Sequence, residues 1–266
     1  MLLAILVWLL AATVAVLFGI RKWWFPEGIN AHARAFDEYF LITLLLTGTI
    51  FILAQFFLGW LILKNRNRRD PVVHSEGNNR LEFVWTAAAA LLFVGIAAAS
   101  STIWSNLHIE QPSPQAIRIE TMAKQFAWSF RYPGVDGKFG RTAIKFINDA
   151  NGNPFGLDEA DPTGKDDIVT SAVRVPVNTP IVLQLKARDV IHNFFVRELR
   201  LKQDLVPGMD IPLAFTADKP GTYEVACSEL CGLGHHQMRT TLIVMEKPEF
   251  DAWLKQMAAQ LTGAAQ

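Results

Sequence analysis

Both cysteines of this 266-residue chain lie in one stretch of twelve residues, which reads Cys227-Ser228-Glu229-Leu230-Cys231-Gly232-Leu233-Gly234-His235-His236-Gln237-Met238. The two thiols are four residues apart, His235 follows Cys231 by four residues, and Met238 follows His235 by three. This spacing allows short turns to fold the four side chains toward one point. Thiolate, imidazole and thioether groups form a soft set of ligands, which favours copper over magnesium or calcium. The stretch therefore predicts a metal-binding loop.

Other interpretations of this stretch stay open from its residues alone. The cysteines can form a disulfide if the domain is exported to an oxidising compartment. They can also be two buried apolar side chains, as free cysteines often are. Two Cys and two His suit a tetrahedral structural zinc site as well. Met238 favours copper among these, because a thioether is a common copper ligand and a poor zinc ligand.

Apolar residues, which make up 51% of the chain, form three long uncharged runs within the first 110 residues. These runs, at about 1–20, 39–63 and 83–105, have the length of membrane-spanning helices. We therefore predict a membrane anchor with three transmembrane helices over residues 1–110, embedded in a lipid bilayer, and an exported domain over residues 111–266. The basic and acidic residues, 25 of each, give no indication of a nucleic-acid partner.

The first run can be a retained span or a cleaved signal peptide. No basic segment precedes it and no small-residue cleavage site follows it, so we expect a retained span. The loop after the second run, residues 64–80, carries five Lys or Arg, against three between the first two runs, which predicts that it is cytoplasmic. The N-terminus is then inside and the C-terminal domain is periplasmic. The Ala-rich spans suit a bacterial inner membrane.

Beyond the linker Gln111-Pro112-Ser113-Pro114, apolar and polar residues alternate with a period of two, for example at 117–120 and 173–177. Many short strands separated by Gly and Pro turn signals are typical of a β-sandwich or barrel. A polar insertion at about 136–169 interrupts the strands, and a short helix begins near Lys247. The predicted fold class is N-terminal transmembrane α-helices followed by an all-β sandwich.

A further metal ligand is available upstream of the loop. The stretch Asp189-Val190-Ile191-His192 places His192 beside bulky apolar residues, 35 positions before Cys227. A single histidine in such a place is usually a hydrogen-bonded core residue. Beside a loop that holds two Cys, a His and a Met, it is instead expected to converge on the same metal.

These residues resemble subunit II of the haem–copper cytochrome c oxidases. The resemblance lies in the motif Cys227-x-Glu229-x-Cys231-Gly232-x-x-His235-x-x-Met238, preceded by Asp189-Val190-Ile191-His192. It extends to the start of the third apolar run at 79–86, the aromatic stretch at 125–132, and residues 202–208. It implies a cupredoxin-like Greek-key sandwich on a helical hairpin, here with an extra N-terminal span.

The resemblance further implies a binuclear copper A centre with two copper ions, bridged by the two cysteine thiolates. His192 and Met238 would complete one copper. His235 and the backbone carbonyl of Glu229 would complete the other, and the Glu229 side chain would reach an interfacial Mg²⁺ shared with subunit I. His236, next to a ligand, is expected to be structural because a tight turn directs neighbouring side chains apart.

The implied function is that of the subunit through which a terminal oxidase receives electrons. Electrons from a c-type cytochrome would pass through copper A to the haem of subunit I, where oxygen is reduced and protons are pumped. The implied partners are subunit I, with haem a and copper B, and subunit III. No Cys-x-x-Cys-His motif is present, so we expect no haem on this chain. Glu82, an acid favoured by the dipole of the third apolar helix, is also implied as the entrance of a proton channel.

The aromatic stretch departs from the family pattern at the position of the usual electron-accepting tryptophan, which here is Phe126. Trp128 follows two residues later, and we expect this pair to relay electrons. Met209 likewise replaces a usual arginine. We therefore hypothesise that the donor is a bound c-type cytochrome domain of a neighbouring complex, such as an alternative complex III, rather than freely diffusing cytochrome c.

Three other functions compete with this one. A membrane-tethered copper carrier or assembly chaperone would need no partner at Glu229 or Glu82. A quinol oxidase subunit would have lost the metal ligands that are present here. A nitrous oxide reductase shares the metal motif, but it needs a large propeller domain for which this chain has no room.

Overall fold

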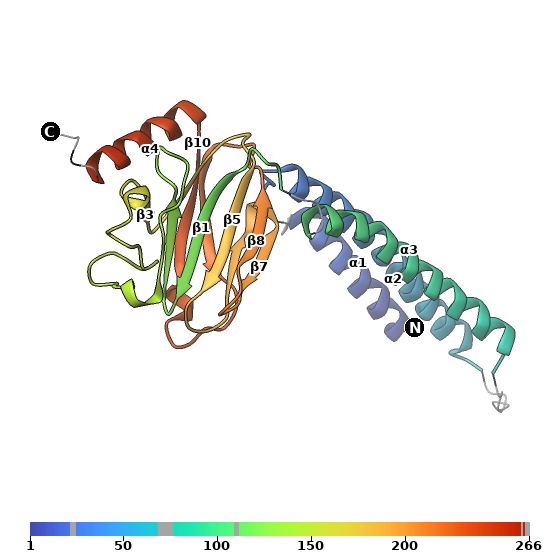
Figure 1. Ribbon diagram of the computed structural model, residues 1–266. Helices are drawn as coiled ribbons and strands as arrows, with labels where there is room; N and C mark the ends of the chain where they lie inside the picture. Colours follow the sequence, from blue (N-terminus) through green and yellow to red (C-terminus); the bar gives the residue numbers. More distant parts are fainter. Residues whose placement is uncertain (22–24, 69–76, 109–111, 262, 264–266) are drawn as a thin grey trace. The chain divides into compact units, whose positions relative to one another are not determined.

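The computed structural model describes residues 1–21, 25–68, 77–108, 112–261 and 263. They form two compact units, shown in Figure 1: a helical unit (Met1–Phe25 and Ala35–Trp104) and a sandwich unit (Pro26–Arg34 and Ser105–Gln266). Residues 69–76 of the loop predicted to be cytoplasmic, and Gln111 of the predicted linker, lie outside the described residues.

Three helices form the helical unit: α1 (Leu2–Arg21), α2 (Ala31–Asn65) and α3 (Asn79–His108). Each is long and apolar enough to cross a membrane. The side chain of Asn78 caps α3, because its Oδ1 accepts the backbone N–H groups of Arg80 and Leu81 at 3.1 Å each. Glu82 follows in the first turn, where a negative charge is favoured by the helix dipole.

Helix α1 packs closely against α2 at one point. The indole of Trp8 stacks on Phe56 with ring centroids 5.1 Å apart, and its N–H donates to the Phe56 carbonyl at 3.2 Å. A Cβ atom at Gly59 would lie 2.2 Å from the Trp8 ring nitrogen, so only glycine leaves room for the indole. Small residues allow this kind of close approach between membrane helices.

Ten strands within the described residues form the sandwich: β1 (Ile117–Lys124), β2 (Ala127–Tyr132), β3 (Ile168–Thr170), β4 (Val173–Pro176), β5 (Ile181–Ala187), β6 (His192–Val196), β7 (Leu201–Leu205), β8 (Ile211–Phe215), β9 (Gly221–Cys227) and β10 (Arg239–Met245). They pair as two five-stranded sheets with the orders β3-β2-β1-β5-β8 and β4-β10-β9-β6-β7. Pairs β1–β5 and β4–β10 are parallel, because the chain crosses between sheets there. The predicted fold class, helices followed by a sandwich, is confirmed.

The core lies between the two sheets and is lined by inward-facing residues such as Ile119, Leu183 and Phe194. The predicted alternation holds for Ile119 and for the exposed Arg118. Glu120 departs from it: the alternation makes it a surface position, but its side chain is buried because it pairs with Arg131 of β2. A buried carboxylate needs such a partner.

The segment between α1 and α2 belongs to the sandwich unit, although it lies in the range predicted as membrane anchor. Ile29 is only 2% exposed and is part of the sandwich core. Its N–H donates to the Glu198 carbonyl at 3.0 Å, and its carbonyl accepts the Asp218 N–H at 2.8 Å. Ion pairs of Lys219 with Glu27 and of Arg34 with Asp218 flank it. Residues 26–34 are therefore built into the sandwich.

The last helix, α4 (Lys247–Leu261), follows β10 and packs on the sandwich through Phe250 and Trp253. The Trp253 ring meets Tyr132 edge-on, with centroids 5.1 Å apart. Since β10 separates this helix from the cysteine loop, α4 covers the end of the strand that lies away from that loop.

Candidate metal centre

Two neighbouring strands bring the predicted ligands together. His192 is the first residue of β6 and Cys227 is the last residue of β9. These strands are antiparallel partners, with Phe194 opposite Cys227, so His192 lies at the end of the sheet where the cysteine loop begins. The loop then returns through the short 3-10 helix η4 (His235–Gln237) into β10, which pairs with β9.

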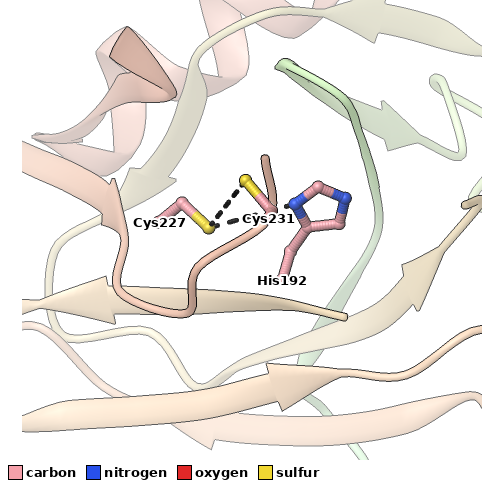
Figure 2. Close-up of side chains that lie close together, drawn as sticks. All are labelled: His192, Cys227 and Cys231. Carbon is pink, nitrogen blue, oxygen red and sulfur yellow. Dashed lines mark hydrogen bonds between the residues drawn. The ribbon is translucent and has the colours of Figure 1, made fainter. Parts of the chain in front are cut away.

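Every predicted ligand atom lies beside one of the two thiols. Cys227 Sγ is 3.3 Å from the Glu229 carbonyl oxygen and 3.9 Å from His192 Nδ1. Cys231 Sγ is 3.5 Å from His235 Nδ1 and 3.8 Å from Met238 Sδ. Figure 2 shows the three side chains together, with dashed lines from the Cys227 sulfur to the Cys231 sulfur and to the His192 ring. The metal-binding group of His and Cys side chains that the sequence predicts is thus assembled.

The two cysteines are free thiols in this structure. Their Sγ atoms are 3.9 Å apart, whereas a disulfide bond is about 2.05 Å long. Burial, together with the neighbouring Cys227, raises the pKa of Cys231 to about 11. A bound metal must displace this proton, because the thiolate is the ligand.

The residues present fit copper better than they fit a structural zinc ion. Two thiols, two imidazoles, a thioether and a carbonyl exceed the four ligands of a tetrahedral zinc site. Cys227, Cys231, Met238 and His192 are buried and so shielded from water, whereas His235 is partly exposed. A buried set of soft sulfur and imidazole donors is what copper prefers.

Three other residues singled out from the sequence differ in their position relative to the metal-binding group. The Glu229 side chain is exposed while its carbonyl faces Cys227, and His236 is exposed on η4. Glu82 is in the helical unit and does not join the metal-binding group, which lies in the sandwich unit.

The two aromatic residues of the predicted relay differ in exposure. Phe126 is 39% exposed. Its ring lies against the loop, since a Cβ at Gly234 would be 2.4 Å from the ring and one at Gly232 would be 3.1 Å from it. Trp128 is buried below, edge-on to Phe194, with its indole N–H 3.5 Å from the Met238 carbonyl. Phe126 therefore packs at the surface against Gly232 and Gly234, and Trp128 supports the loop from inside.

Two residues that support the site were not singled out from the sequence. Asp189 Oδ1 is 2.8 Å from His192 Nε2, and its Oδ2 accepts the backbone N–H of Gln125 at 2.7 Å. Gln125 Nε2 donates to the Cys231 carbonyl at 2.5 Å. When Nε2 carries the proton toward Asp189, the Nδ1 lone pair faces Cys227, which is the orientation a metal requires. The sequence feature that could have indicated this role is the position of Asp189, three residues before the predicted ligand His192.

Asp189→Asn is expected to lower copper affinity about 10–100-fold, because an amide orients the imidazole less firmly and polarises it less than a carboxylate does. The measurement is a competition titration of the purified full-length chain against a copper chelator. Asp210→Asn is the control, since Asp210 is a surface carboxylate 3.4 Å from Lys186 and carries the same charge. Equal copper affinity of the two variants would contradict the prediction.

The fold and the site define a membrane-anchored β-sandwich protein with a cysteine–histidine metal-binding group. Residues 117–246 match the family described as "Cytochrome C oxidase subunit II, periplasmic domain", and residues 21–103 match its transmembrane domain. The chain belongs to the cytochrome c oxidase subunit II family. Members of this family are subunits of an enzyme, cytochrome c oxidase. It is a membrane protein whose sandwich lies outside the membrane.

Named relatives agree with this assignment. The "Alternative cytochrome c oxidase subunit 2" of Bradyrhizobium diazoefficiens is 32% identical over 94% of this chain and 90% of its own length. "Cytochrome c oxidase subunit 2" of Thermostichus vulcanus is 30% identical over 96% of this chain and 86% of its own length. The crystal structure of the periplasmic domain of subunit II of Bradyrhizobium japonicum cytochrome oxidase covers 57% of this chain and 99% of that domain, with a TM-score of 0.41 and 29% identity.

Proposed function

We propose that this chain receives electrons for a terminal haem–copper oxidase. Electrons from a c-type cytochrome would enter at the sandwich and continue to the haem of subunit I, where oxygen is reduced and protons are pumped. A centre of two copper ions, bound by His192, Cys227, Glu229, Cys231, His235 and Met238, would supply the one-electron chemistry.

The observation that carries this proposal is the arrangement of donors around the thiols. Cys227 Sγ has an imidazole nitrogen and a carbonyl oxygen beside it, and Cys231 Sγ has an imidazole nitrogen and a thioether beside it. With the sulfurs 3.9 Å apart, each is close enough to serve as a ligand on both sides. Copper held by these donors would supply one-electron chemistry, and donors fixed by the strands and the loop would keep the structural change on electron transfer small.

The residues of the chain would perform three tasks in this reaction. The strands β6 and β9 hold the ligand atoms in place, so that little rearrangement accompanies electron transfer. Burial of the cysteines and Met238 excludes water, and Asp189 orients His192. Phe126 provides the exposed aromatic contact with the donor, and the loop carries the electron inward to a partner subunit.

The proposed location is the bacterial inner membrane, with the sandwich on the periplasmic side and three spans. Residues 26–34 pack on the sandwich, which supports placing the α1–α2 connection on the outer side and the basic α2–α3 loop inside. The contact of Trp8 with α2 at Gly59 supports a retained first span rather than a cleaved one.

The proposed partners are oxidase subunits I and III, with haem a and copper B in subunit I. The exposed Glu229 side chain suits a shared Mg²⁺ at an interface, because hard cations take carboxylate ligands. Glu82, at the start of α3, would lie at a proton-channel entrance on the inner side. The chain itself carries no haem in this proposal.

Copper analysis combined with EPR tests the proposed centre. The full-length chain is the appropriate sample, because residues 26–34 are part of the sandwich. We expect two coppers per chain and one unpaired electron shared between them. A single copper, or zinc in its place, would refute the proposed centre, and an active chain that never co-purifies with a haem-containing partner would favour the copper-carrier function.

Phe126→Trp is expected to leave the copper content unchanged and to raise kcat/KM severalfold for freely diffusing cytochrome c. The reason is that a larger, more polarisable ring would then face the donor above Gly232 and Gly234. Steady-state kinetics measure this effect, and Phe146→Trp on the insertion is the control for an added indole at a partly exposed site. An unchanged donor preference would weaken the proposal of a bound donor domain. Rapid oxidation of soluble cytochrome c by the wild type, with a steep loss at high salt, would overturn it.

A further inference from the structure

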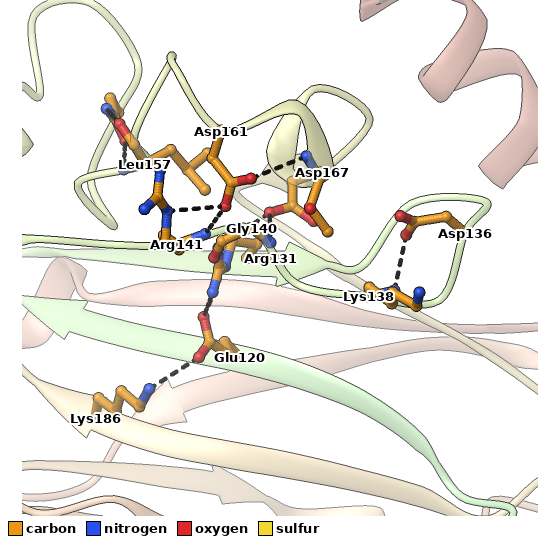
Figure 3. Close-up of polar contacts among 12 residues, drawn as sticks. Glu120, Arg131, Asp136, Lys138, Gly140, Arg141, Leu157, Asp161, Asp167 and Lys186 are labelled. Atoms are coloured by element: carbon orange, nitrogen blue, oxygen red, sulfur yellow. Dashed lines mark hydrogen bonds and ion pairs between the residues drawn. The ribbon is translucent and has the colours of Figure 1, made fainter.

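The polar insertion between β2 and β3 is held firmly at its base. Arg131 of β2, with its side chain only 2% exposed, donates through Nη1 to Asp167 and to the Gly140 carbonyl, each at 3.0 Å. Its Nε donates to Glu120 at 2.6 Å, and its guanidinium lies 4.7 Å from the Phe139 ring centroid. Figure 3 shows this network. Because removing one partner of a buried ion pair is costly, the base of the insertion is fixed to the sheet.

The middle of the insertion forms a tight hairpin, and Asp149 lies at its tip. Residue pairs Thr142–Leu157 and Asn148–Asn153 form antiparallel bridges along it. Gly152 closes the turn at a φ of 71°, a left-handed conformation that favours glycine. The hairpin therefore presents Asp149 at a defined position.

Asp149 binds two basic side chains of the sandwich. Its Oδ1 accepts a hydrogen bond from Arg188 Nη1 at 2.9 Å and its Oδ2 accepts one from Arg188 Nη2 at 2.5 Å, while Oδ2 is also 2.8 Å from Lys124 Nζ. Such a two-pronged pair fixes geometry as well as charge. Hydrogen bonds from Arg188 and Lys124 hold the pKa of the Asp149 carboxyl well below its usual range, which favours its ionised form.

Both basic residues adjoin the segments that support the metal loop. Lys124 ends β1 directly before Gln125 and Phe126, and Arg188 directly precedes Asp189. Gln125 binds the Cys231 carbonyl, and Asp189 binds His192. The tip of the insertion thus lies beside the two segments that contact the cysteine loop and His192.

We use the name input face for Phe126, the loop residue Leu233 and the four charged residues that adjoin the Gln125–Phe126 and Asp189–His192 segments. Phe126 covers the loop, and Leu233 is 97% exposed. The charges are the cations of Lys124 and Arg188 and the anions of Asp149 and Asp189. They balance only because the insertion contributes Asp149.

We infer that Asp149 determines donor specificity by neutralising the input face. This inference rests on the proposed electron-receiving function. A face whose positive and negative charges balance gives no long-range steering to a strongly charged donor. It fits a c-type cytochrome whose haem edge is surrounded by apolar, weakly charged surface, and it disfavours both strongly basic and strongly acidic donors.

The test is steady-state oxidation of two soluble c-type cytochromes by the complete oxidase at low ionic strength. One probe has a basic surface around its haem edge, and the other has an acidic one. Asp149→Asn leaves two cations against one anion on the input face. We expect kcat/KM to fall about threefold for the basic probe and to rise about threefold for the acidic one, with both changes fading above roughly 0.15 M salt.

Two further variants separate charge from structure. Lys124→Gln added to Asp149→Asn restores the balance of charge without restoring the contacts, so kcat/KM for both probes should return toward wild type. Asp251→Asn, which breaks the 2.9 Å surface pair with Lys247 on α4, makes the same charge change away from the input face and should have no effect. Similar effects of Asp149→Asn and Asp251→Asn, a shift of both probes in one direction, or no rescue by Lys124→Gln would each overturn the inference.

Copper content distinguishes a failure of this inference from a failure of the proposed function. Variants are compared only in preparations with the copper content of the wild type. A wild-type oxidase that lacks copper and oxidises neither cytochrome would overturn the proposed function and the inference together. Normal wild-type turnover with an insensitive Asp149→Asn variant would overturn the inference alone.

Discussion

Replacement of Cys231 by Ser is expected to abolish the two-copper centre and to lower cytochrome c oxidation more than about 100-fold, since losing a group that merely orients a ligand already costs roughly 10–100-fold. The Sγ atom of Cys231 lies beside the Cys227 Sγ, the His235 imidazole and the Met238 thioether. Its loss therefore removes the donor atom that the other three groups surround. A hydroxyl is a hard donor and does not replace a thiolate toward copper. Copper analysis, EPR and turnover of the purified oxidase measure the effect.

The matched control for this variant is His236→Ala. His236 is exposed and adjoins the ligand His235, so its replacement alters the same 3-10 helix without touching the donor set. Copper content and turnover should stay near those of the wild type. The haem content of the partner subunit should be normal in both variants, which separates loss of the centre from loss of assembly. Normal turnover of Cys231→Ser would remove the whole metal assignment.

Replacement of Ile29 by Ala is expected to destabilise the sandwich by about 2–4 kcal/mol, because it leaves a cavity where a buried side chain was. Ile29 is 2% exposed and is part of the sandwich core, although it precedes all the strands in the sequence. Each kcal/mol lowers the unfolding midpoint by about 2–4 °C in a domain of this size. Thermal unfolding of the full-length chain in detergent, followed by tryptophan fluorescence, measures the shift.

Ile144→Ala provides the control with identical chemistry. Ile144 belongs to the same unit, on the insertion, but it is 87% exposed. Its truncation removes little buried surface and should change stability by less than about 0.5 kcal/mol. Equal shifts for the two variants would show that residues 26–34 do not contribute to the folded sandwich.

A stabilising role for Ile29 also has a consequence for fragments. A soluble fragment that begins at the linker would lack Ile29. It would therefore lose the hydrogen bond from the Ile29 N–H to the Glu198 carbonyl and the one from the Asp218 N–H to the Ile29 carbonyl. The sandwich core would then be open at that point, and exposed apolar surface favours association. Copper binding and electron transfer are therefore best measured with the segment present.

Local patterns were sufficient to predict the fold class and the metal-binding group. Length and hydropathy identify membrane helices because the bilayer sets a minimum span, and alternation identifies strands because successive side chains face opposite ways. The soft donors of the loop indicated a metal because they are close in sequence. His192 was within reach because its stretch matches the family pattern.

Only the tertiary structure decided what depends on contacts between distant segments. Alternation could not show that Glu120 is buried, since its partner Arg131 lies on the neighbouring strand. Polar composition predicted an insertion at about 136–169, but it carried no sign that Asp149 reaches Lys124 and Arg188.

The segment at 26–34 makes the same point for the core. A short polar stretch between two apolar runs looks like a connection, yet Ile29 enters the sandwich because strands from elsewhere leave a site that it fills. The sequence by itself determined which elements form and which side chains are available as metal donors, because those depend on local periodicity and ligand chemistry. The tertiary structure alone decided which charges surround the input face and what completes the core, because burial and ion pairing arise only when distant strands pack together.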